Sequence, residues 1–181
     1  VEEIYSDVNK SADDRKIEFR LFDCADAYIL STELLNEKIN KDNKPACTIY
    51  GTYQVEKEYN CKFNDDKIHV VYAGTFDPRK GGAQASLSAV PYLGEKYHMH
   101  IVGFGSGEDT KNVKEDISRL ANNCKCKVTY DGLLSGEEYI RFLQSCHIGM
   151  STQNPKGDYN DTSFPSKILS YLANGLHVVS I

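Results

Sequence analysis

The sequence predicts an α/β protein with a Rossmann-like parallel sheet and helices on both faces. From residue 68 onward, short apolar runs alternate with helical patterns of about 10–15 residues, which is typical of right-handed βαβ crossovers. Residues 161–181 combine a helix pattern, Gly175 as a helix exit and a mostly apolar run. Such a run is typical of a strand that is covered on both faces.

Composition limits the function classes. The chain has 181 residues, is 40% hydrophobic and carries a formal net charge of −5. We therefore expect a globular chain of one sizeable domain, or one domain plus a fragment. An acidic chain lacks the basic face of most nucleic-acid-binding proteins, so we expect no nucleic-acid partner. No apolar run approaches about 18 residues and no signal peptide is visible, so we expect no membrane span.

Six cysteines are present, at positions 24, 47, 61, 124, 126 and 146. None forms a CxxC pair and no His/Cys spacing resembles a zinc site, so we expect buried free thiols in a reducing cytosol. The chain begins at Val1 and stops within an apolar run. We interpret it as a fragment of a longer protein.

The first 53 residues read as a separate set of elements. Ser11 and Asp14 have the form of a capping box before a helix over 12–23. We then expect a strand over 27–30, a helix capped by Ser31 or Thr32 that ends near residue 39, and a strand over 47–50. Residues 54–67 are polar and lack periodicity, which favours a linker; an ordinary surface loop is the alternative.

Regular alternation follows the linker. We expect strands over 68–74, 99–103, 127–130, 148–152 and 176–181, and helices over 82–93, 113–122 and 136–144. A last helix is expected to begin with Thr162 or Ser163 as its cap and Pro165 in its first turn. Its apolar face would consist of Ile168, Leu169 and Leu172.

The loops that follow parallel strands leave from one edge of the sheet, where ligands bind in open α/β folds. Here these loops span residues 75–81, 104–108, 133–135 and 153–166. Arg79 and Lys80 stand beside a glycine pair at a helix start, and Gly105 lies in a glycine-rich loop. Lys167 opposes the helix dipole at a cost of about 0.3–1 kcal/mol, which a bound anion would reverse. Together these features predict a phosphate or diphosphate site, although a tight turn or a solvated loop explains each one alone.

Other chemistries fit less well. A dinucleotide fingerprint is absent after the first strand of this half, and no Walker A loop occurs. His98, His100, His147 and His177 lie in or beside predicted strands, where a structural role is favoured over that of a base.

Four segments resemble, in order and spacing, the donor domain of GT-B glycosyltransferases, most closely family 4 (the group 1 transferases). They are YAGTFDPRKG at 72–81, VGFGSGE at 102–108, VTYDG at 128–132 and FPSKILSYLANG at 164–175. Residues 25–53 more weakly resemble the end of the acceptor domain. The resemblance implies the C-terminal half of a GT-B fold, truncated at its C-terminus. Residues 1–53 would end the N-terminal acceptor domain, 54–67 would be the linker, and 68–181 would form an incomplete donor-binding domain.

The resemblance also implies roles for residues. Lys80 would contact the donor diphosphate and, with Arg79, stabilise the charge that develops on it. The implied donor-binding set is Gly74, Thr75, Gly105, Leu133, Ser163, Phe164, Pro165, Ser166, Lys167 and Ser170. Thr75 stands where the family has an arginine, and Arg79 would supply the missing positive charge from a shifted position. The family's paired glutamates, the second of which contacts the ribose, correspond to Thr162 and Ser170, and Asp161 would substitute one residue away.

By the same resemblance, the sugar is transferred with retention from a UDP- or GDP-linked donor to a glycan or lipid-linked acceptor. No hydrophobic-DxD motif is present, so we expect no divalent metal and no other cofactor. The acceptor site would lie in the missing N-terminal domain, and the chain alone would be inactive. We expect a cytoplasmic location, with peripheral binding at the inner membrane face as an alternative. A non-catalytic module with a degenerate donor site and a nucleotide-sugar epimerase stay open.

Overall fold

The computed structural model describes residues 1–9 and 11–180. Within them the chain divides into two compact units. The first consists of residues 1–52 with 155–166, and the second consists of residues 53–154 with the segment from residue 167 onward. In the described part of the chain, no helix has both the length and the apolarity that a membrane span requires.

The first unit packs short helices around a small parallel sheet of two strands. Its elements are α1 (Tyr5–Asn9), α2 (Ala12–Asp23), β1 (Tyr28–Leu30), α3 (Glu33–Ile39), β2 (Ala46–Thr48) and the 3-10 helix η2 (Asp158–Asp161). The predicted caps are confirmed: the Ser11 hydroxyl accepts from Asp14 N–H at 3.2 Å, and the Thr32 hydroxyl accepts from Leu35 N–H at 3.3 Å. The second predicted strand is shorter and earlier than expected, and α1 and η2 were not expected.

A buried carboxylate joins helices α1, α2 and α3 of the first unit. Asp7 is 6% exposed and forms ion pairs with Arg15 and with Lys38, the latter at 2.7 Å. Two cations offset the cost of removing this carboxylate from water. The core consists of Ile4, Tyr28, Leu30, Leu35 and Ile39.

The second unit is a five-stranded parallel sheet with helices on both faces, which confirms the predicted fold class. Its strands are β3 (Ile68–Thr75), β4 (Tyr97–Phe104), β5 (Lys127–Gly132), β6 (Ile148–Ser151) and β7 (His177–Ser180). Its helices are α4 (Gly82–Leu87), the 3-10 helix η1 (Val90–Tyr92), α5 (Gly107–Asn123), α6 (Gly136–Gln144) and α7 (Ser166–Ala173). The strand order is β5-β4-β3-β6-β7, so the order reverses between β3 and β6.

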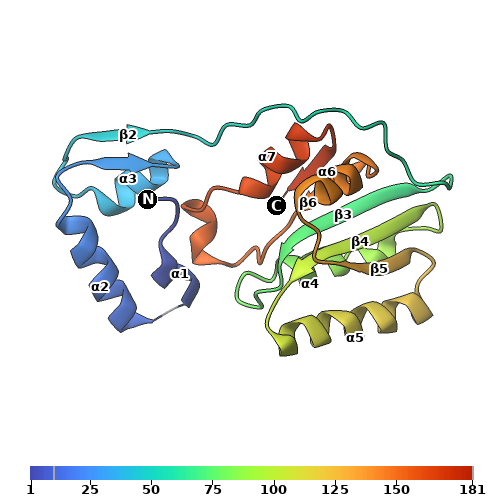
Figure 1. The fold of residues 1–181 in the computed structure, drawn as a ribbon. Coiled ribbons are helices and arrows are strands. Elements are labelled where there is room, and N and C mark those ends of the chain that lie inside the picture. Colours follow the sequence, from blue (N-terminus) through green and yellow to red (C-terminus); the bar gives the residue numbers. More distant parts are fainter. Residues whose placement is uncertain (10, 181) are drawn as a thin grey trace. The chain divides into compact units, whose positions relative to one another are not determined.

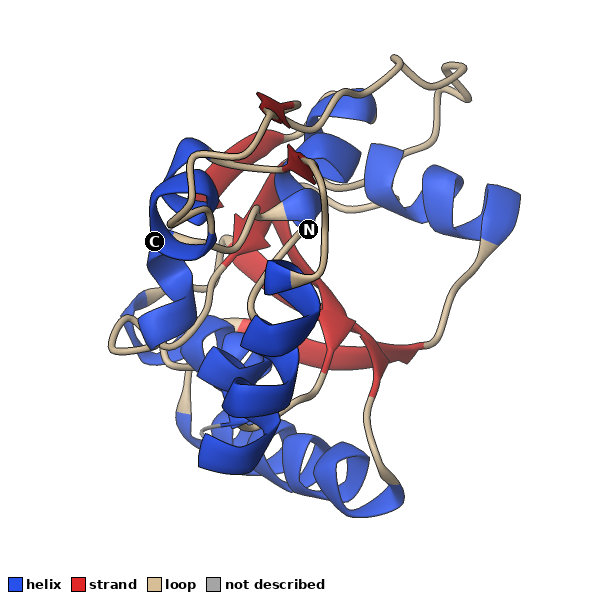
Figure 2. Cartoon of the chain, turned by 90° about the vertical axis from the view of Figure 1, so that its left-hand side faces the viewer, coloured by secondary structure: helices blue, strands red, loops and turns tan. Residues whose placement is uncertain are grey.

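The two faces of this sheet have separate cores because side chains alternate along each strand. Val70 and Tyr72 of β3 pack with Leu87 and Val113 on the side of α4 and α5. Val71 and Ala73 face the other side and pack with Leu143 of α6 and Tyr171 of α7. Figure 1 shows these helix pairs on opposite sides of the sheet, and Figure 2 colours the strands red between the blue helices.

Tyr171 joins α7 to the point where the strand order reverses. β3 and β6 pair only at Val70–Ile148 and Val71–Gly149. Beyond that point the Tyr171 hydroxyl accepts from Ala73 N–H at 2.9 Å and donates to the Met150 carbonyl at 3.2 Å. The side chain is fully buried, and its ring lies where a Cβ on Gly149 would collide with it. One hydroxyl therefore satisfies two strand groups that have separated from each other.

Two helices differ from their predicted bounds. The helix expected over 82–93 is instead α4 followed by η1, because Pro91 lacks an N–H and cannot continue an α-helix. α5 begins six residues earlier than the predicted start at residue 113, at Gly107. The Ser106 hydroxyl caps it by accepting from Asp109 N–H at 3.1 Å.

The predicted cap of the last helix is wrong. α7 begins at Ser166, so Pro165 precedes the helix, while Thr162 follows η2. Its predicted apolar face is also incorrect, because Leu172 is 39% exposed and the buried residues are Tyr171 and Ala173. The exit is confirmed: Gly175 has φ +78°, and Leu176 N–H donates to the Tyr171 carbonyl at 3.0 Å.

Two further expectations need correction. The last strand, predicted to be covered on both faces, is largely exposed in the described residues of β7. All six cysteines are free as predicted, but only Cys126 and Cys146 are buried. Residues 53–67 contain neither helix nor strand, as expected for the predicted linker and equally for the alternative, a surface loop. The Glu56 N–H donates to the Ala173 carbonyl at 2.9 Å and ties this segment to α7.

Replacing Tyr171 with phenylalanine should lower the free energy of unfolding by about 1–3 kcal/mol, because two buried backbone groups lose their partner. Urea unfolding of the full chain measures this. Tyr92→Phe is the matched control, since Tyr92 is 89% exposed and surface changes usually stay within about 0.5 kcal/mol. A Tyr171 variant as stable as the parent chain would contradict the role of this hydroxyl as the partner of both strand groups.

Candidate functional site at the carboxyl edge of the sheet

The candidate site lies where β3 and β6 end side by side. Because all five strands are parallel, the loops after β3, β4, β5 and β6 leave from the same edge. The reversal of strand order between β3 and β6 marks the place on this edge where ligands bind in open α/β sheets. The predicted loops therefore do leave from one edge of the second unit, whereas residues 155–166 of the last loop belong to the first unit.

The loop after β3 is a compact turn that ends at the start of α4. Phe76 is fully buried, and its N–H donates to the Phe104 carbonyl at 2.7 Å. The Asp77 carbonyl accepts from the N–H groups of Lys80 and Gly81 at 3.1 and 2.9 Å. Gly81 has φ +64°, a left-handed conformation that favours glycine. The turn thus fixes the position of the Lys80 backbone at this edge of the sheet.

Arg79 is paired within its own loop. Its Nη2 lies 2.7 Å from Asp77 Oδ2, and its Nε lies 2.9 Å from Asp77 Oδ1. The hydrogen bonds from Arg79 hold the pKa of the Asp77 carboxyl below its usual range, and the pKa of Arg79 is correspondingly raised. An incoming phosphate would compete with Asp77 for this guanidinium.

Hydrogen bonds tie the loop after β6 to the loop after β3. Asn154 N–H donates to the Lys80 carbonyl at 2.8 Å. Thr152 Oγ1 donates to the Gly82 carbonyl at 2.9 Å and lies 2.5 Å from Ser86 Oγ. Sequence reasoning missed Thr152 and Asn154, since nothing in their local pattern indicates that they contact α4 and its preceding loop.

Lys167 belongs to the first turn of α7, and its side chain lies beside Gly74 near the end of β3. A Cβ on Gly74 would collide with Lys167 Cε, and Lys167 Nζ is 5.5 Å from the centre of the Tyr72 ring. The Tyr72 hydroxyl donates to the Thr75 carbonyl at 2.9 Å. Burial raises the pKa of the Tyr72 phenol, which therefore stays neutral and adds no negative charge beside the lysine.

The glycine-rich loop after β4 packs closely against β3. Gly103 has φ +135°, and a Cβ there would collide with the Gly74 carbonyl. A Cβ on Gly105 would lie 2.9 Å from Phe76 Cβ. Gly105 is half-buried at this contact. Close packing of β4 against β3 thus accounts for Gly103, and close packing of the two following loops accounts for Gly105.

Leu133 and Ser170 occupy different surroundings. Leu133 is 64% exposed after β5, at the far side of the same edge. Ser170 faces α6, and its hydroxyl is 3.3 Å from the Tyr139 hydroxyl. A ribose that used Ser170 would share this hydroxyl with Tyr139.

Four predicted donor-binding residues belong to the first unit: Ser163, Phe164, Pro165 and Ser166. The Ser163 hydroxyl donates to Glu3 Oε2 at 3.2 Å, and Ser166 N–H donates to the Phe164 carbonyl at 2.9 Å. Thr162 is buried, and its hydroxyl has no hydrogen-bond partner among the described residues. Their place in a donor site stays a prediction.

The histidines lie where predicted, in or beside strands, but sequence reasoning did not single out His69. It joins His98 and His100 in a buried group on the α6 side of β3 and β4. Burial lowers the pKa of His69, and it lowers the pKa of His98 to about 4. A signal was available, because two histidines separated by one residue in a strand share a face.

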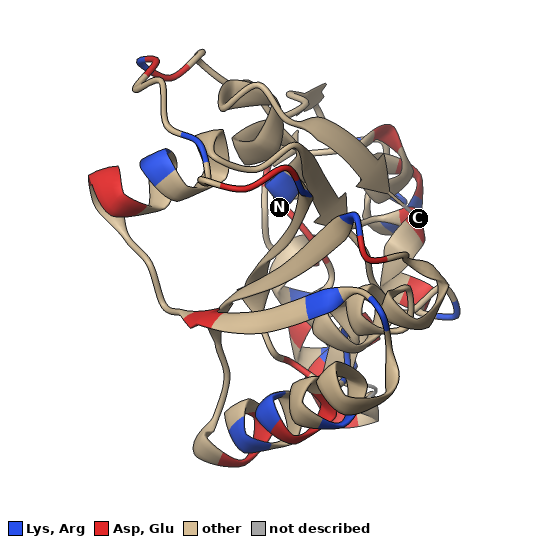
Figure 3. Cartoon of the chain, turned by 90° about the vertical axis from the view of Figure 1, so that its right-hand side faces the viewer, with Lys and Arg blue, Asp and Glu red and all other residues tan. Residues whose placement is uncertain are grey.

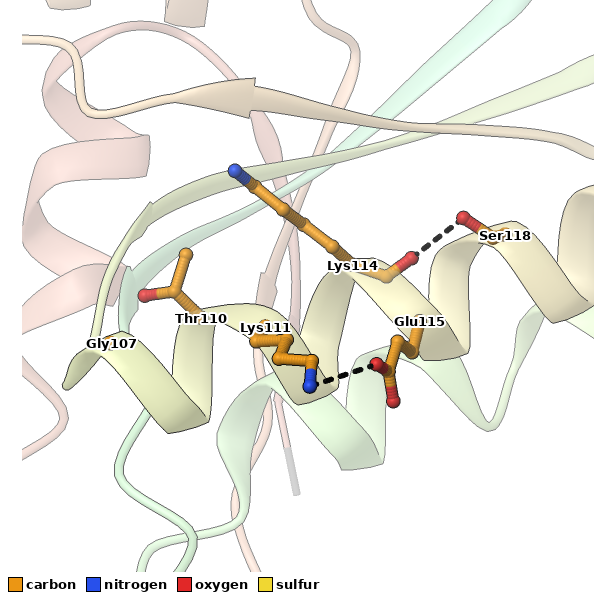
Figure 4. A pocket seen from close by; sticks show the side chains of 6 residues that line it. All are labelled: Gly107, Thr110, Lys111, Lys114, Glu115 and Ser118. Carbon is orange, nitrogen blue, oxygen red and sulfur yellow. Dashed lines mark hydrogen bonds and ion pairs between the residues drawn. The ribbon is translucent and has the colours of Figure 1, made fainter.

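A hollow of about 450 Å³ lies along the outer surface of α5 (Figure 4). Lys111 and Glu115 line it and form an exposed ion pair at 3.7 Å. Acidic and basic residues alternate along this helix (Figure 3). Exposed pairs of opposite charge leave little net attraction for an anion, so the hollow is a weaker candidate than the edge of the sheet.

Comparison with known proteins identifies the fold. No protein-family model matches the chain, and no curated protein matches it. Among solved structures, Anabaena HepE with UDP and glucose has a TM-score of 0.72 at 13% identity, over 99% of this chain and 51% of HepE. The pneumococcal O-GlcNAc transferase GtfA, with UDP and GlcNAc, has a TM-score of 0.62 at 16% identity, over 93% of this chain and 32% of GtfA.

The lipopolysaccharide outer core galactosyltransferase WaaB, in its apo form, has a TM-score of 0.62 at 14% identity, over 96% of this chain and 46% of WaaB. At such identities the likeness defines the fold: a half of the GT-B type seen in these transferases. The chain spans about a third to a half of the length of these three structures.

The close approach of α4 to Tyr72 and Thr152 can be tested with alanine at Gly82. Its Cβ would lie 2.5 Å from the Tyr72 hydroxyl and 2.9 Å from the Thr152 carbonyl, so we expect a loss of about 1–3 kcal/mol in the free energy of unfolding. Gly107→Ala is the control, because no atom lies within 4 Å of that Cβ. It should be neutral or stabilise by up to about 1 kcal/mol. A Gly82 variant as stable as the control would show that α4 lies farther from Tyr72 and Thr152.

Proposed function

We propose that this chain is the donor-binding half of a family 4-type glycosyltransferase, which takes a sugar from a nucleotide diphosphate and transfers it with retention. The observation that carries the proposal is the placement of Lys167 against Gly74 at the reversal of strand order. Beside it, hydrogen bonds from the loop after β6 fix the loop that carries Lys80. The likeness to two transferase structures and to the UDP complex of HepE supports the same reading.

The chemistry assigned to this chain is stabilisation of a leaving group. When the bond between the sugar and the diphosphate breaks, negative charge develops on the diphosphate. Lys80 comes from the loop after β3 and Lys167 from the first turn of α7, so they would oppose that charge from two elements. Lysine binds phosphate as a point charge, so neither needs the planar fit that arginine makes. The proposal requires no divalent metal at this edge.

UDP is the first donor nucleotide to test, because HepE and GtfA are bound to UDP in their structures. GDP is the alternative. The acceptor would be a glycan or a lipid-linked glycan held by a part of the protein outside this chain, in glycan or polysaccharide biosynthesis. Such a transferase would work in the cytoplasm, in solution or at the inner face of the membrane.

A non-catalytic module with a degenerate donor site is the second candidate. Arg79 is paired with Asp77, and the Ser170 hydroxyl is shared with Tyr139. Both arrangements reduce what the chain offers to a diphosphate or a ribose. This candidate predicts a well-folded chain that binds no nucleotide.

Isothermal calorimetry with UDP, GDP and ADP separates the two candidates. We expect UDP to bind, and Lys80→Ala and Lys167→Ala each to weaken the affinity about tenfold or more, because a hydrogen bond to a charged group contributes about 1.5–3 kcal/mol. Lys96→Ala is the matched control. Lys96 is exposed in the turn before β4, at the opposite end of the strands. A folded chain that binds none of the three nucleotides would favour the degenerate module.

The pairing of Arg79 with Asp77 gives a second test. Asp77→Asn removes a negative charge from the site and releases Arg79, so UDP should bind several-fold more tightly, on the order of 1 kcal/mol. Asp66→Asn removes the same charge before the start of β3 and should leave the affinity unchanged. Weaker binding of UDP to the Asp77 variant would mean that Asp77 orders the loop rather than competing with the phosphate.

A further inference from the structure

The other end of the same strands carries three buried imidazoles, the histidine triad of His69, His98 and His100. His69 of β3 and His98 of β4 are partners in the ladder, and His100 lies two residues further along β4. Each is at most 5% exposed. The triad lies toward the amino ends of the strands, so it is separate from the edge that carries Gly74 and Lys167.

One ring nitrogen of each histidine has a polar partner outside the triad. The contacts are His69 Nε2 to Asp65 Oδ1 at 2.7 Å, His100 Nδ1 to Asp131 Oδ2 at 3.0 Å, and His98 Nε2 to Thr129 Oγ1 at 3.0 Å. Histidines that bind metals in proteins have such outer partners, which fix the tautomer and the orientation of the ring.

The remaining nitrogens point to a ligand. His69 Nδ1 and His100 Nε2 lie 2.9 Å apart. His98 Nδ1 is buried and has no hydrogen-bond partner in the described part of the chain. Burying a polar nitrogen without a partner is unfavourable, so a ligand that used it would stabilise the fold.

Counting hydrogens leads to the same conclusion. A carboxylate only accepts hydrogen bonds, so Asp65 and Asp131 each require an N–H on the outer nitrogen of their histidine. Both inner nitrogens of His69 and His100 are then lone pairs, which face each other at 2.9 Å. Either one additional proton or a cation must lie between them. A divalent cation would also use the free nitrogen of His98 and would balance the charge of the two carboxylates.

We propose that the histidine triad binds one divalent transition-metal ion of the zinc class through His69 Nδ1, His98 Nδ1 and His100 Nε2. One ligand nitrogen from each residue lies within 4.8 Å of the others, and a modest movement of the rings would bring them to the ~2.0–2.1 Å of Zn–N bonds. Imidazole is a ligand that suits zinc, copper and nickel.

The surroundings of the triad favour a structural site. Phe63 stacks on His69 and His100 at ring-centre distances of 4.0 and 4.9 Å, and Phe142 meets His100 edge-on at 5.2 Å. These rings shield the triad from water. The ion would join β3 to β4 at their amino ends and would take no part in chemistry at the opposite edge.

Titration of the EDTA-stripped full chain with Co²⁺ and Zn²⁺ tests the proposal. We expect one equivalent of Co²⁺ to give visible absorption bands without a thiolate charge-transfer band, and Zn²⁺ to displace it. Zn²⁺ should raise the melting temperature, since it binds the folded chain. His98→Asn should weaken binding at least about a hundredfold, and Asp131→Asn, an outer partner, about 10–100-fold. His177→Gln, outside the triad, should bind like the parent chain.

Three results would overturn the proposal. The first is a stripped chain that is folded by circular dichroism and binds no Co²⁺. The second is a thiolate band, which would assign the binding to cysteines such as Cys24 or Cys47, both exposed. The third is parent-like affinity in folded His98 and Asp131 variants. Any of these would leave the triad as a hydrogen-bonded core cluster that shares one additional proton.

Discussion

One phenolic hydroxyl makes the separation of β3 from β6 possible. The two strands pair at only two positions, and beyond them the groups that would have continued the ladder would be buried without partners. The Tyr171 hydroxyl accepts from one and donates to the other. Gly149 allows the ring to approach, because a Cβ there would collide with it. The strands can therefore diverge beyond these two positions without leaving either group unpaired.

Backbone hydrogen bonds fix the loop that brings Lys80 to this edge of the sheet. Asn154 joins the two loops through its backbone, because its N–H donates to the Lys80 carbonyl. Lys167 sits in the first turn of α7, where the helix dipole disfavours a cation in the absence of an anion. Arg79 has its own carboxylate. Lys80 and Lys167 add two further cations to this part of a chain whose overall charge is negative.

Much of the fold could be predicted because its signals are local. Apolar runs and glycine exits predicted the parallel sheet, and capping residues predicted α2 and α3. Pro91 carried a readable signal that the helix over 82–93 must break. Other features depend on tertiary contacts. Leu172 has an apolar side chain, as core residues do, but it is exposed. The buried residue of that turn is Tyr171. The apolar sequence of β7 likewise did not reveal an exposed strand, and the register that pairs His69 with His98 cannot be read from their spacing.

The interlocked partners of His69, His98 and His100 affect how this chain can vary among its homologues. These groups form one network, in which Thr129 Oγ1 lies 3.0 Å from His98 Nε2 and 3.4 Å from His100 Nδ1. A single change therefore leaves a neighbouring group without its partner, and the energetic effects of two changes do not add. Single substitutions at these positions are therefore disfavoured. The positions should covary as a block, present together in one lineage or replaced together by an aliphatic core in another.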